Sequence, residues 1–342
     1  MKHFEYIKDR KIFFKEPEEF NVNSEKDLLC HGLGATLYMP AIRPELFKDI
    51  KNTKAASVVI CLEDSIPEQQ LDEAEENIVK LFEKLALDRE LLHKLPLLFI
   101  RIRNREQLKR LLGRSELQGL CGFVLPKFTP TTGEGLLELI DSFNKLNSRK
   151  LYVMPIIETP EVIYKETRAE ALINIKEVLD KHKELVLNVR IGGTDFSGIY
   201  GIRRSRSNTI YELKVISDVI TDIINVFKRA DYVISAPVNE YFNEGNSTLV
   251  METILDKANG LLGKTAIHPK QVNIINSLLA VTKEEYEDAF DIVSSDKKGA
   301  LKSKYSNKMN EVGPHLKWAK ETMLRARTMG VLEDGRDYKT LL

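Results

Sequence analysis

The feature that most constrains this chain is a short apolar run that recurs eight times, each time followed by a polar turn, with amphipathic stretches between the runs. The runs occupy residues 35–39, 57–62, 97–102, 122–125, 151–157, 187–191, 232–235 and 264–267. They are apolar almost throughout, which is typical of parallel strands buried on both faces. Eight strand–helix units of this spacing most simply close into a (β/α)₈ barrel, the TIM barrel. We therefore predict an α/β protein with that architecture.

Two regions fall outside the eight units. Residues 1–30 are polar and aromatic, and we expect them to cross or plug one end of the barrel. From about residue 281 the chain becomes helical and basic, and its last helix is expected to start near Pro314. We accordingly divide the chain into a TIM-barrel catalytic domain with an N-terminal extension, residues 1–280, and a C-terminal helical arm, residues 281–342.

The composition excludes several classes of protein. Lys and Arg together number 51, as do Asp and Glu, so the chain lacks the basic excess of a dedicated nucleic-acid binder. No apolar run approaches the roughly 20 residues of a membrane-spanning helix. The three cysteines are an odd number without CxxC spacing, which disfavours a disulfide framework and favours a cytoplasmic location.

Ionisable side chains recur at the same place in the pattern, at the carboxyl end of the apolar runs. In a TIM barrel the active site lies at the carboxyl ends of the strands, and nearly every run ends on such a residue. In chain order these are Arg43, Glu63 with Asp64, Arg101, Lys127, Glu158, Asp195, Asn239 with Glu240, and His268. Charges scattered over the surface would not coincide with the strand ends in this way. The pattern therefore predicts an active site at one rim of the barrel.

Glu158 and Asp195 are the candidate metal ligands. They follow adjacent strands, and two carboxylates completed by substrate oxygens and water are a usual way to hold Mg²⁺. Each has an alternative: Glu158 as a carboxylate stabilised at a helix N-terminus, and Asp195 as part of a flexible glycine turn.

The neighbouring charged residues also allow two interpretations each. Glu63 and Asp64 either hold metal-bound waters or cap the following helix. Arg101 lies in an apolar strand, where it either meets an anion in the site or forms a buried structural pair with Glu63 or Asp64. The basic loop with Arg203, Arg204 and Arg206 is either solvated or contacts a phosphate. His268 is read as a structural residue that fixes the last turn.

Seven short motifs, in order along residues 35–320, resemble those of the citrate lyase beta-subunit-like, or HpcH/HpaI aldolase, family. The motifs are Pro40–Pro44, Cys61–Asp64, Ile100–Asn104, Leu125–Lys127, Ile157–Thr159, Gly192–Asp195 and Ile267–Gln271. The chain departs from the family where Ala41 replaces a glycine and Cys61 replaces an aspartate. These departures resemble a divergent branch, the TIM-barrel C–C bond lyases associated with tellurite resistance.

In that family an acid on the C-terminal arm reaches the site of a neighbouring subunit. The matching stretch here is residues 307–311, and Glu311 falls at the place of the acid. The arm also has an apolar face with Trp318, Met323 and Leu324, which an isolated helix cannot bury. We therefore expect a homo-oligomer with closed symmetry, a trimer or a hexamer.

The resemblance implies Mg²⁺-dependent cleavage or formation of a carbon–carbon bond beside a carbonyl, through an enolate. The substrate would be an α-keto or α-hydroxy acid or its acyl thioester, with no nucleic acid or membrane as a partner. Glu158 and Asp195 would bind the metal. Arg101, Glu311 and Asp64 would be catalytic, and Arg43, Arg101 and Lys127 would bind substrate. The alternatives are a metal-dependent hydrolase of a related acyl or phosphorylated compound, and a barrel that binds without catalysis.

Overall fold

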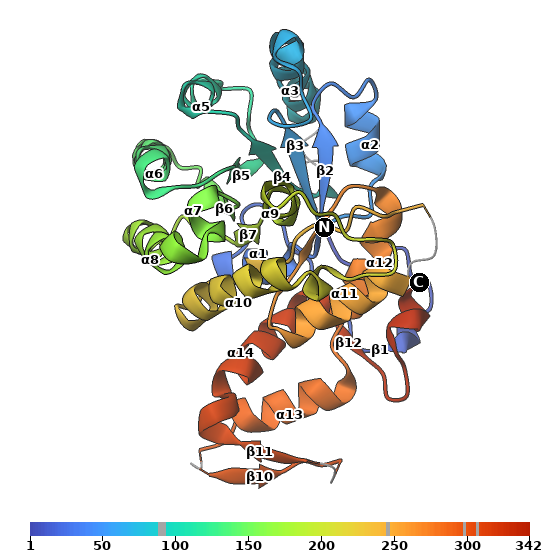
Figure 1. Cartoon of the computed structure of the whole chain (residues 1–342). Helices are drawn as coiled ribbons and strands as arrows, with labels where there is room; N and C mark the ends of the chain where they lie inside the picture. Colours follow the sequence, from blue (N-terminus) through green and yellow to red (C-terminus); the bar gives the residue numbers. More distant parts are fainter. Residues whose placement is uncertain (88–93, 244–246, 297–298, 306–307) are drawn as a thin grey trace.

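The computed structural model describes residues 1–87, 94–243, 247–296, 299–305 and 308–342, and eight parallel strands form its centre (Figure 1). The strands are β2 (Ala35–Pro40), β3 (Ser57–Cys61), β4 (Leu97–Arg101), β5 (Leu120–Leu125), β6 (Tyr152–Ile157), β7 (Val189–Ile191), β8 (Ile234–Ser235) and β9 (Lys264–Ala266). They pair in the order β8-β7-β6-β5-β4-β3-β2-β9. A bridge between Ala236 and Lys264 joins the two edge strands and nearly closes the sheet. The predicted α/β TIM barrel is confirmed.

Helices surround the barrel and connect its strands. The helices between the strands are α2 (Leu46–Asn52), α3 (Leu71–Ala86), α5 (Arg105–Leu112), α6 (Pro130–Leu146), α8 (Lys165–Lys181), α10 (Lys214–Arg229) and α11 (Ser247–Ala258), and α12 (Pro269–Leu279) follows the last strand. Two short helices, α7 (Pro160–Ile163) and α9 (Gly193–Ile199), follow β6 and β7 directly. Single 3₁₀ turns lie at Arg10–Ile12, Glu68–Gln70, Ile210–Glu212 and Tyr338–Leu341.

Local sequence fixes where several of these helices begin. The Asn104 side chain accepts a hydrogen bond from the backbone N–H of Gln107 and so caps α5. Thr129 caps α6 in the same way, with Pro130 in the first turn. The His268 ring caps α12 by accepting from the backbone N–H of Lys270 at 3.2 Å. This contact agrees with the structural role expected for His268.

The N-terminal segment closes the amino-terminal end of the barrel, as expected. Phe20 and the helix α1 (Lys26–Gly32), together with Leu33, form one buried cluster with side chains that fill the barrel interior. Those interior side chains include Val59, Phe99, Val124 and Met154. Because packed apolar groups fill the barrel interior towards this end, a ligand inside the barrel itself has room only near the carboxyl ends of the strands.

The C-terminal region contains more than the expected helices. It comprises α13 (Lys283–Val293), a hairpin of β10 (Ala300–Lys302) and β11 (Met309–Glu311), the long helix α14 (Val312–Met329) and β12 (Val331–Leu332). In Figure 1, α14 runs beneath the barrel, and the hairpin lies beyond α13, outside the barrel. β12 pairs antiparallel with β1 (Phe13–Lys15), so this region packs on the N-terminal extension. None of the described helices is long and apolar enough to span a bilayer.

Candidate active site

A cavity of about 230 Å³ opens at the carboxyl ends of the strands, where the sequence predicts the site. It is bounded by residues from β2, β4, β6, β7 and β9 and from the loops that follow the strands. The lining residues are Tyr38, Asp64, Arg101, Ile156, Glu158, Arg190–Asp195, Val238, Thr265 and Ile267. Arg101, Asp64 and both predicted metal ligands are therefore brought together in one place.

Glu158 directly follows β6 and is held by the backbone on two sides. Its Oε1 accepts a hydrogen bond from the backbone N–H of Lys127 at 2.8 Å. Lys127 is in the left-handed region at φ 47°, a strained conformation for a residue with a Cβ and one found at functional sites. On the other side Gly192 approaches so closely that a Cβ there would lie 2.3 Å from Glu158 Oε2. The carboxylate is thus fixed by backbone contacts that tolerate little change.

Asp195 lies in the first turn of α9 and is half-buried. Its carboxylate has no hydrogen bond or ion pair with any described residue, although it lines the cavity with Glu158. The pKa of Glu158 is raised to about 7 overall: burial raises it most, Arg101 opposes this rise, and the nearby Asp195 adds to it. Two carboxylates that repel each other across a cavity are a donor set that fits a hard divalent cation.

No described group of three or more His, Cys, Asp or Glu side chains is arranged to hold a metal ion. A cation at Glu158 and Asp195 would therefore rest on two protein carboxylates. Mg²⁺ is commonly bound in this way, with water and substrate oxygens as its remaining ligands.

Arg101, at the end of β4, is buried and surrounded by carboxylates. Its Nη2 lies 2.7 Å from Glu63 Oε2, 3.0 Å from Asp64 Oδ2 and 3.4 Å from Glu158 Oε1. Burial lowers the pKa of Arg101, but the negative groups around it outweigh that effect, and the net shift is upward. Arg101 forms the structural pair with Glu63 and Asp64, and it also faces the cavity. The two interpretations, a structural pair and a contact with an anion in the site, therefore do not exclude each other.

Lys127 completes a charged rim with Glu63 and Asp64. Its Nζ lies 2.5 Å from Glu63 Oε1 and 3.1 Å from Asp64 Oδ1. Burial alone would raise the pKa of Asp64, but a hydrogen bond with Glu63 and the two cations Arg101 and Lys127 lower it overall. Asp64 is half exposed at the mouth of the cavity and ionised at neutral pH, whereas Glu63 is buried beneath it.

Sequence reasoning missed the role of Arg103. Its Nε donates to the carbonyl oxygen of Leu62 at 3.3 Å, and its Nη2 donates to the carbonyl oxygens of Glu63 at 3.2 Å and Ile66 at 2.5 Å. One guanidinium thus holds the loop that presents Glu63 and Asp64. A second arginine two residues after a strand-end arginine is the signal that could have suggested a supporting role.

Tyr38, Arg190 and Thr265 also line the cavity but were not singled out from the sequence. They lie within the apolar runs of β2, β7 and β9 and not after them. A rule that examines only the residue after each strand overlooks side chains that point into the barrel from the strand itself.

Other predicted site residues lie elsewhere. Arg43 pairs with Asp49 of α2, at 2.6 Å, and does not line the cavity. Glu311 ends β11, and Figure 1 places this hairpin outside the barrel of its own chain. Residue 307, the start of the matching stretch, lies outside the described residues. The roles proposed for Arg43 and Glu311 stay predictions.

The basic loop after α9 is not a uniformly solvated segment. Arg204 is buried at 3% exposure and pairs with Glu240 at 2.5 Å and with Glu252, which in turn lies 2.8 Å from Lys264. Arg203 and Arg206 are exposed. Arg204 therefore has carboxylate partners within the chain, and a phosphate is not needed to explain its charge.

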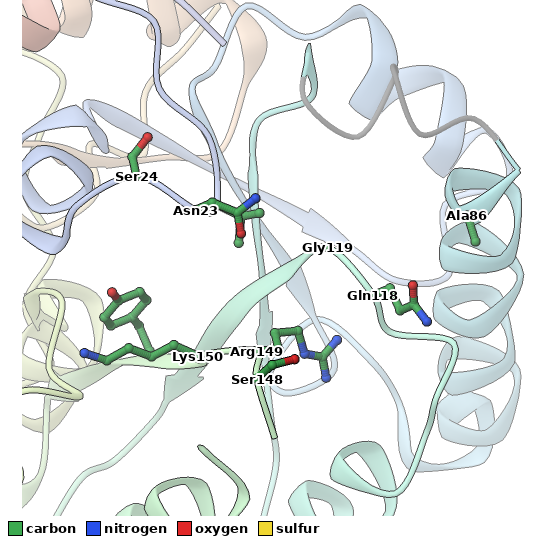
Figure 2. Close-up of a pocket in the computed structure, with 10 residues that line it drawn as sticks. Asn23, Ser24, Ala86, Gln118, Gly119, Ser148, Arg149 and Lys150 are labelled. Atoms are coloured by element: carbon green, nitrogen blue, oxygen red, sulfur yellow. The ribbon is translucent and has the colours of Figure 1, made fainter. Parts of the chain in front are cut away.

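A larger cavity, of about 600 Å³, lies at the opposite end of the barrel (Figure 2). Its wall includes Asn23 and Ser24 of the N-terminal segment, and Gln118 and Gly119, which precede β5. Of the described residues that line it, none is Asp, Glu, His or Cys. Its described lining therefore offers no carboxylate, imidazole or thiolate to hold a metal, so the smaller cavity is the candidate active site.

A TIM barrel whose acidic and basic side chains converge at the carboxyl ends of its strands has the architecture of an enzyme. A family model described as "C-C_Bond_Lyase of the TIM-Barrel fold" matches residues 27–331. The chain belongs to this family of carbon–carbon bond lyases. No curated protein matches it.

Solved structures share the fold at low sequence identity. A citrate lyase from Burkholderia xenovorans is 16% identical, with a TM-score of 0.67, over 91% of this chain and 96% of that one. The protein CitE from Mycobacterium tuberculosis, in complex with magnesium, acetoacetate and coenzyme A, is 20% identical, with a TM-score of 0.58, over 87% and 99%. A magnesium and glyoxylate complex of malate synthase from Haloferax volcanii is 15% identical, with a TM-score of 0.56, over 71% and 74%.

Proposed function

We propose that the protein is a Mg²⁺-dependent lyase or aldolase that cleaves or forms a carbon–carbon bond through an enolate, on an α-keto or α-hydroxy acid or its acyl thioester. The observation that carries this proposal is the convergence of Glu158, Asp195 and Arg101 on one cavity. The CitE complex with magnesium, acetoacetate and coenzyme A and the malate synthase complex with magnesium and glyoxylate support the choice of metal and of a small acid.

Glu158 and Asp195 would hold the cation, and backbone contacts with Lys127 and Gly192 would keep Glu158 in place. Bound Mg²⁺ supplies a Lewis acid that polarises the substrate oxygen. Asp64, half exposed at the cavity mouth, is placed to hold a water or a substrate hydroxyl next to the site.

Arg101 would stabilise the negative charge that develops in the reaction. In the direction of cleavage, the carbon–carbon bond breaks and its electron pair moves onto the departing fragment, whose oxygen becomes an enolate oxygen. A fixed cation close to that oxygen lowers the barrier more than a mobile one, because it needs no reorganisation. Glu63 and Asp64 hold Arg101 in place before the substrate arrives.

A base must also remove a proton from the substrate hydroxyl, and an acid must protonate the enolate carbon. We propose Glu311 of a neighbouring subunit for this transfer, in a trimer or hexamer. Light scattering tests the assembly. In mixtures of inactive Glu311→Gln and inactive Glu158→Gln chains, shared sites would regain activity, whereas a base acting within its own chain would leave the mixture inactive.

The central test is a turnover screen of α-keto and α-hydroxy acids, free and as coenzyme A thioesters, with and without Mg²⁺. The wild type should cleave at least one compound only when Mg²⁺ is present. Glu158→Gln should abolish both turnover and calorimetric Mg²⁺ binding, whereas Glu161→Gln, an exposed carboxylate nearby in α7, should leave both unchanged. Equal Mg²⁺ binding by wild type and Glu158→Gln would contradict the assignment of the ligand.

Two finer predictions accompany this proposal. The departures at Ala41 and Cys61 support placement in the tellurite-resistance-associated branch, and the cysteine pattern supports a cytoplasmic location. All three cysteines are free and buried, in agreement with the absence of a disulfide framework.

A further inference from the structure

The buried arginine and lysine side chains of the described chain have carboxylate partners, with one exception. The paired ones are Arg101 with Glu63, Asp64 and Glu158; Arg168 with Asp218 and Asp222; Arg204 with Glu240 and Glu252; Lys264 with Glu252 and Asp256; and Arg325 with Glu285. The exception is Arg190 of β7. Its side chain is fully buried at 1% exposure, and no described carboxylate lies within ion-pair distance.

The contacts of Arg190 are all with neutral groups. Its Nη1 donates to Thr36 Oγ1 at 3.2 Å and lies 3.9 Å from the sulfur of Met154, and its Nη2 donates to Thr265 Oγ1 at 2.7 Å. Its Nε is buried and has no partner in the described part of the chain. A guanidinium has five N–H donors, so several remain unused.

An unpaired buried charge is costly, because neutral hydroxyls replace only part of its hydration. The two threonine hydrogen bonds connect β7 to β2 and β9. A neutral amide side chain could make the same hydrogen bonds, so this connection does not by itself explain why the residue is an arginine. A charge retained at such a cost, beside a cavity, is explained if a ligand provides the missing anion.

Arg190 lines the same cavity as Arg101, Glu158 and Asp195. Beside it lies Tyr38, whose ring centroid is 5.5 Å from the guanidinium carbon and whose hydroxyl has no hydrogen bond to a described residue. Burial raises the pKa of Tyr38, which keeps this hydroxyl protonated and able to donate. The wall of the cavity therefore offers a cation and a free hydroxyl donor side by side.

We propose that Arg190, together with Tyr38 and Thr265, binds a second carboxylate of the substrate, at the end remote from the group held by Glu158 and Asp195. This inference rests on the proposed function, because it assigns the other end of the same ligand. The volume of about 230 Å³ is below the roughly 300–1,000 Å³ of pockets for drug-sized ligands. The cavity thus admits a short-chain acid.

The test compares acids that differ only in the second carboxylate. Calorimetry with Mg²⁺ measures oxaloacetate against 2-oxobutanoate, and 2-oxoglutarate against 2-oxopentanoate. The wild type should bind the dicarboxylate of at least one pair tenfold or more tightly, in the range expected for hydrogen bonds to a charged group, roughly 10- to 100-fold. Arg190→Met should remove this preference and change the affinity for the matched monocarboxylate by less than about threefold.

Arg105→Met, which removes an exposed arginine, is the matched control and should retain the preference. A preference that survives in a folded Arg190→Met protein, or equal weakening of both acids, would overturn the proposal. If Arg190→Met does not fold, the wild-type comparison and Tyr38→Phe decide: absence of a preference in the wild type overturns it. Succinate against butanoate, measured without metal, separates failure of this subsite from failure of the metal site.

Discussion

The backbone N–H of Lys127 donates to the carboxylate of Glu158 at 2.8 Å, while the side chain of the same lysine pairs with Glu63 and Asp64. One residue therefore links the candidate metal ligand to the rim that holds Arg101. Lys127 makes both contacts with its backbone in the left-handed region, at φ 47°. The site is one connected unit of charges, so a change in one member is expected to affect the others.

Replacing Arg101 with lysine should reduce turnover strongly without unfolding the protein. Lysine keeps the charge but lacks the planar group that contacts Glu63, Asp64 and Glu158 together. We expect kcat to fall by about 100-fold or more, in the range for loss of a fixed oxyanion stabiliser. Steady-state kinetics and the melting temperature check this. Unchanged turnover in a folded variant would make Arg101 purely structural.

Mg²⁺ affinity should depend on pH through Glu158. Burial and Asp195 raise its pKa to about 7, against the opposing effect of Arg101. Below that value the carboxyl holds a proton that Mg²⁺ must displace, so affinity should rise by up to about tenfold per pH unit towards pH 7 and then level off. Calorimetry in buffers of different ionisation enthalpy should detect the released proton. Constant affinity between about pH 5.5 and pH 8 would contradict this.

The same shift has the opposite effect on the stability of the metal-free protein. A carboxyl whose pKa is higher in the folded than in the unfolded state favours folding at low pH. That contribution is lost as pH rises from about 4.5 through about 7. Metal-free protein should therefore melt at a lower temperature on the alkaline side of this range, and added Mg²⁺ should restore the loss.

Arg103 should act as a positioning residue for the loop with Glu63 and Asp64. Arg103→Lys keeps the charge but cannot reach three carbonyl oxygens at once. We expect kcat to fall by about 10- to 100-fold, as is usual for residues that orient a site. Mg²⁺ affinity should change by less than about threefold, because neither metal ligand lies on this loop. Arg105→Lys, at an exposed position, is the control, and equal losses in both variants would contradict the role.

Glu252→Gln should destabilise the fold without touching the cavity. Glu252 is fully buried, pairs with both Arg204 and Lys264, and accepts a hydrogen bond from the backbone N–H of Ile210. Removing one charge from a buried cluster leaves its partners uncompensated, which costs about 3–5 kcal/mol. Urea denaturation should show this loss. Glu240→Gln, at a partner of Arg204 that is less buried, with 21% of its side chain exposed, should cost clearly less, and equal losses would argue against a buried network.

The sequence predicts the barrel because all eight strands are buried on both faces and therefore appear as apolar runs. It also predicts which charged groups meet, since Arg101, Lys127, Glu158 and Asp195 each end a strand or follow one at the same rim. It cannot predict the inward-facing polar groups in the same way. In a strand that is apolar on both faces, periodicity does not indicate whether Arg190 points into the barrel or out of it.

Charge partners that are distant in the chain are equally hard to predict. Arg204 pairs with Glu240 and Glu252, which lie 36 and 48 residues further along the chain. Only the folded barrel brings these residues into contact. Arg43, expected to bind substrate, pairs in the structure with Asp49 on the next helix, and its expected role stays a prediction. The sequence shows that each of these residues is charged. Which partner each one contacts depends on the competition between local and distant partners in the folded protein.

The packing of Phe20 and α1 into the amino-terminal end of the barrel has a kinetic consequence. Because packed apolar side chains separate the candidate active site from that end, we expect both substrates of a condensation, or both products of a cleavage, to pass through the mouth at the carboxyl ends of the strands. If the buried Arg190 holds one fragment as proposed, we expect that fragment to enter before the other one and to leave after it. Product-inhibition patterns should therefore show an ordered mechanism, in which the acid bound deepest is the last to be released.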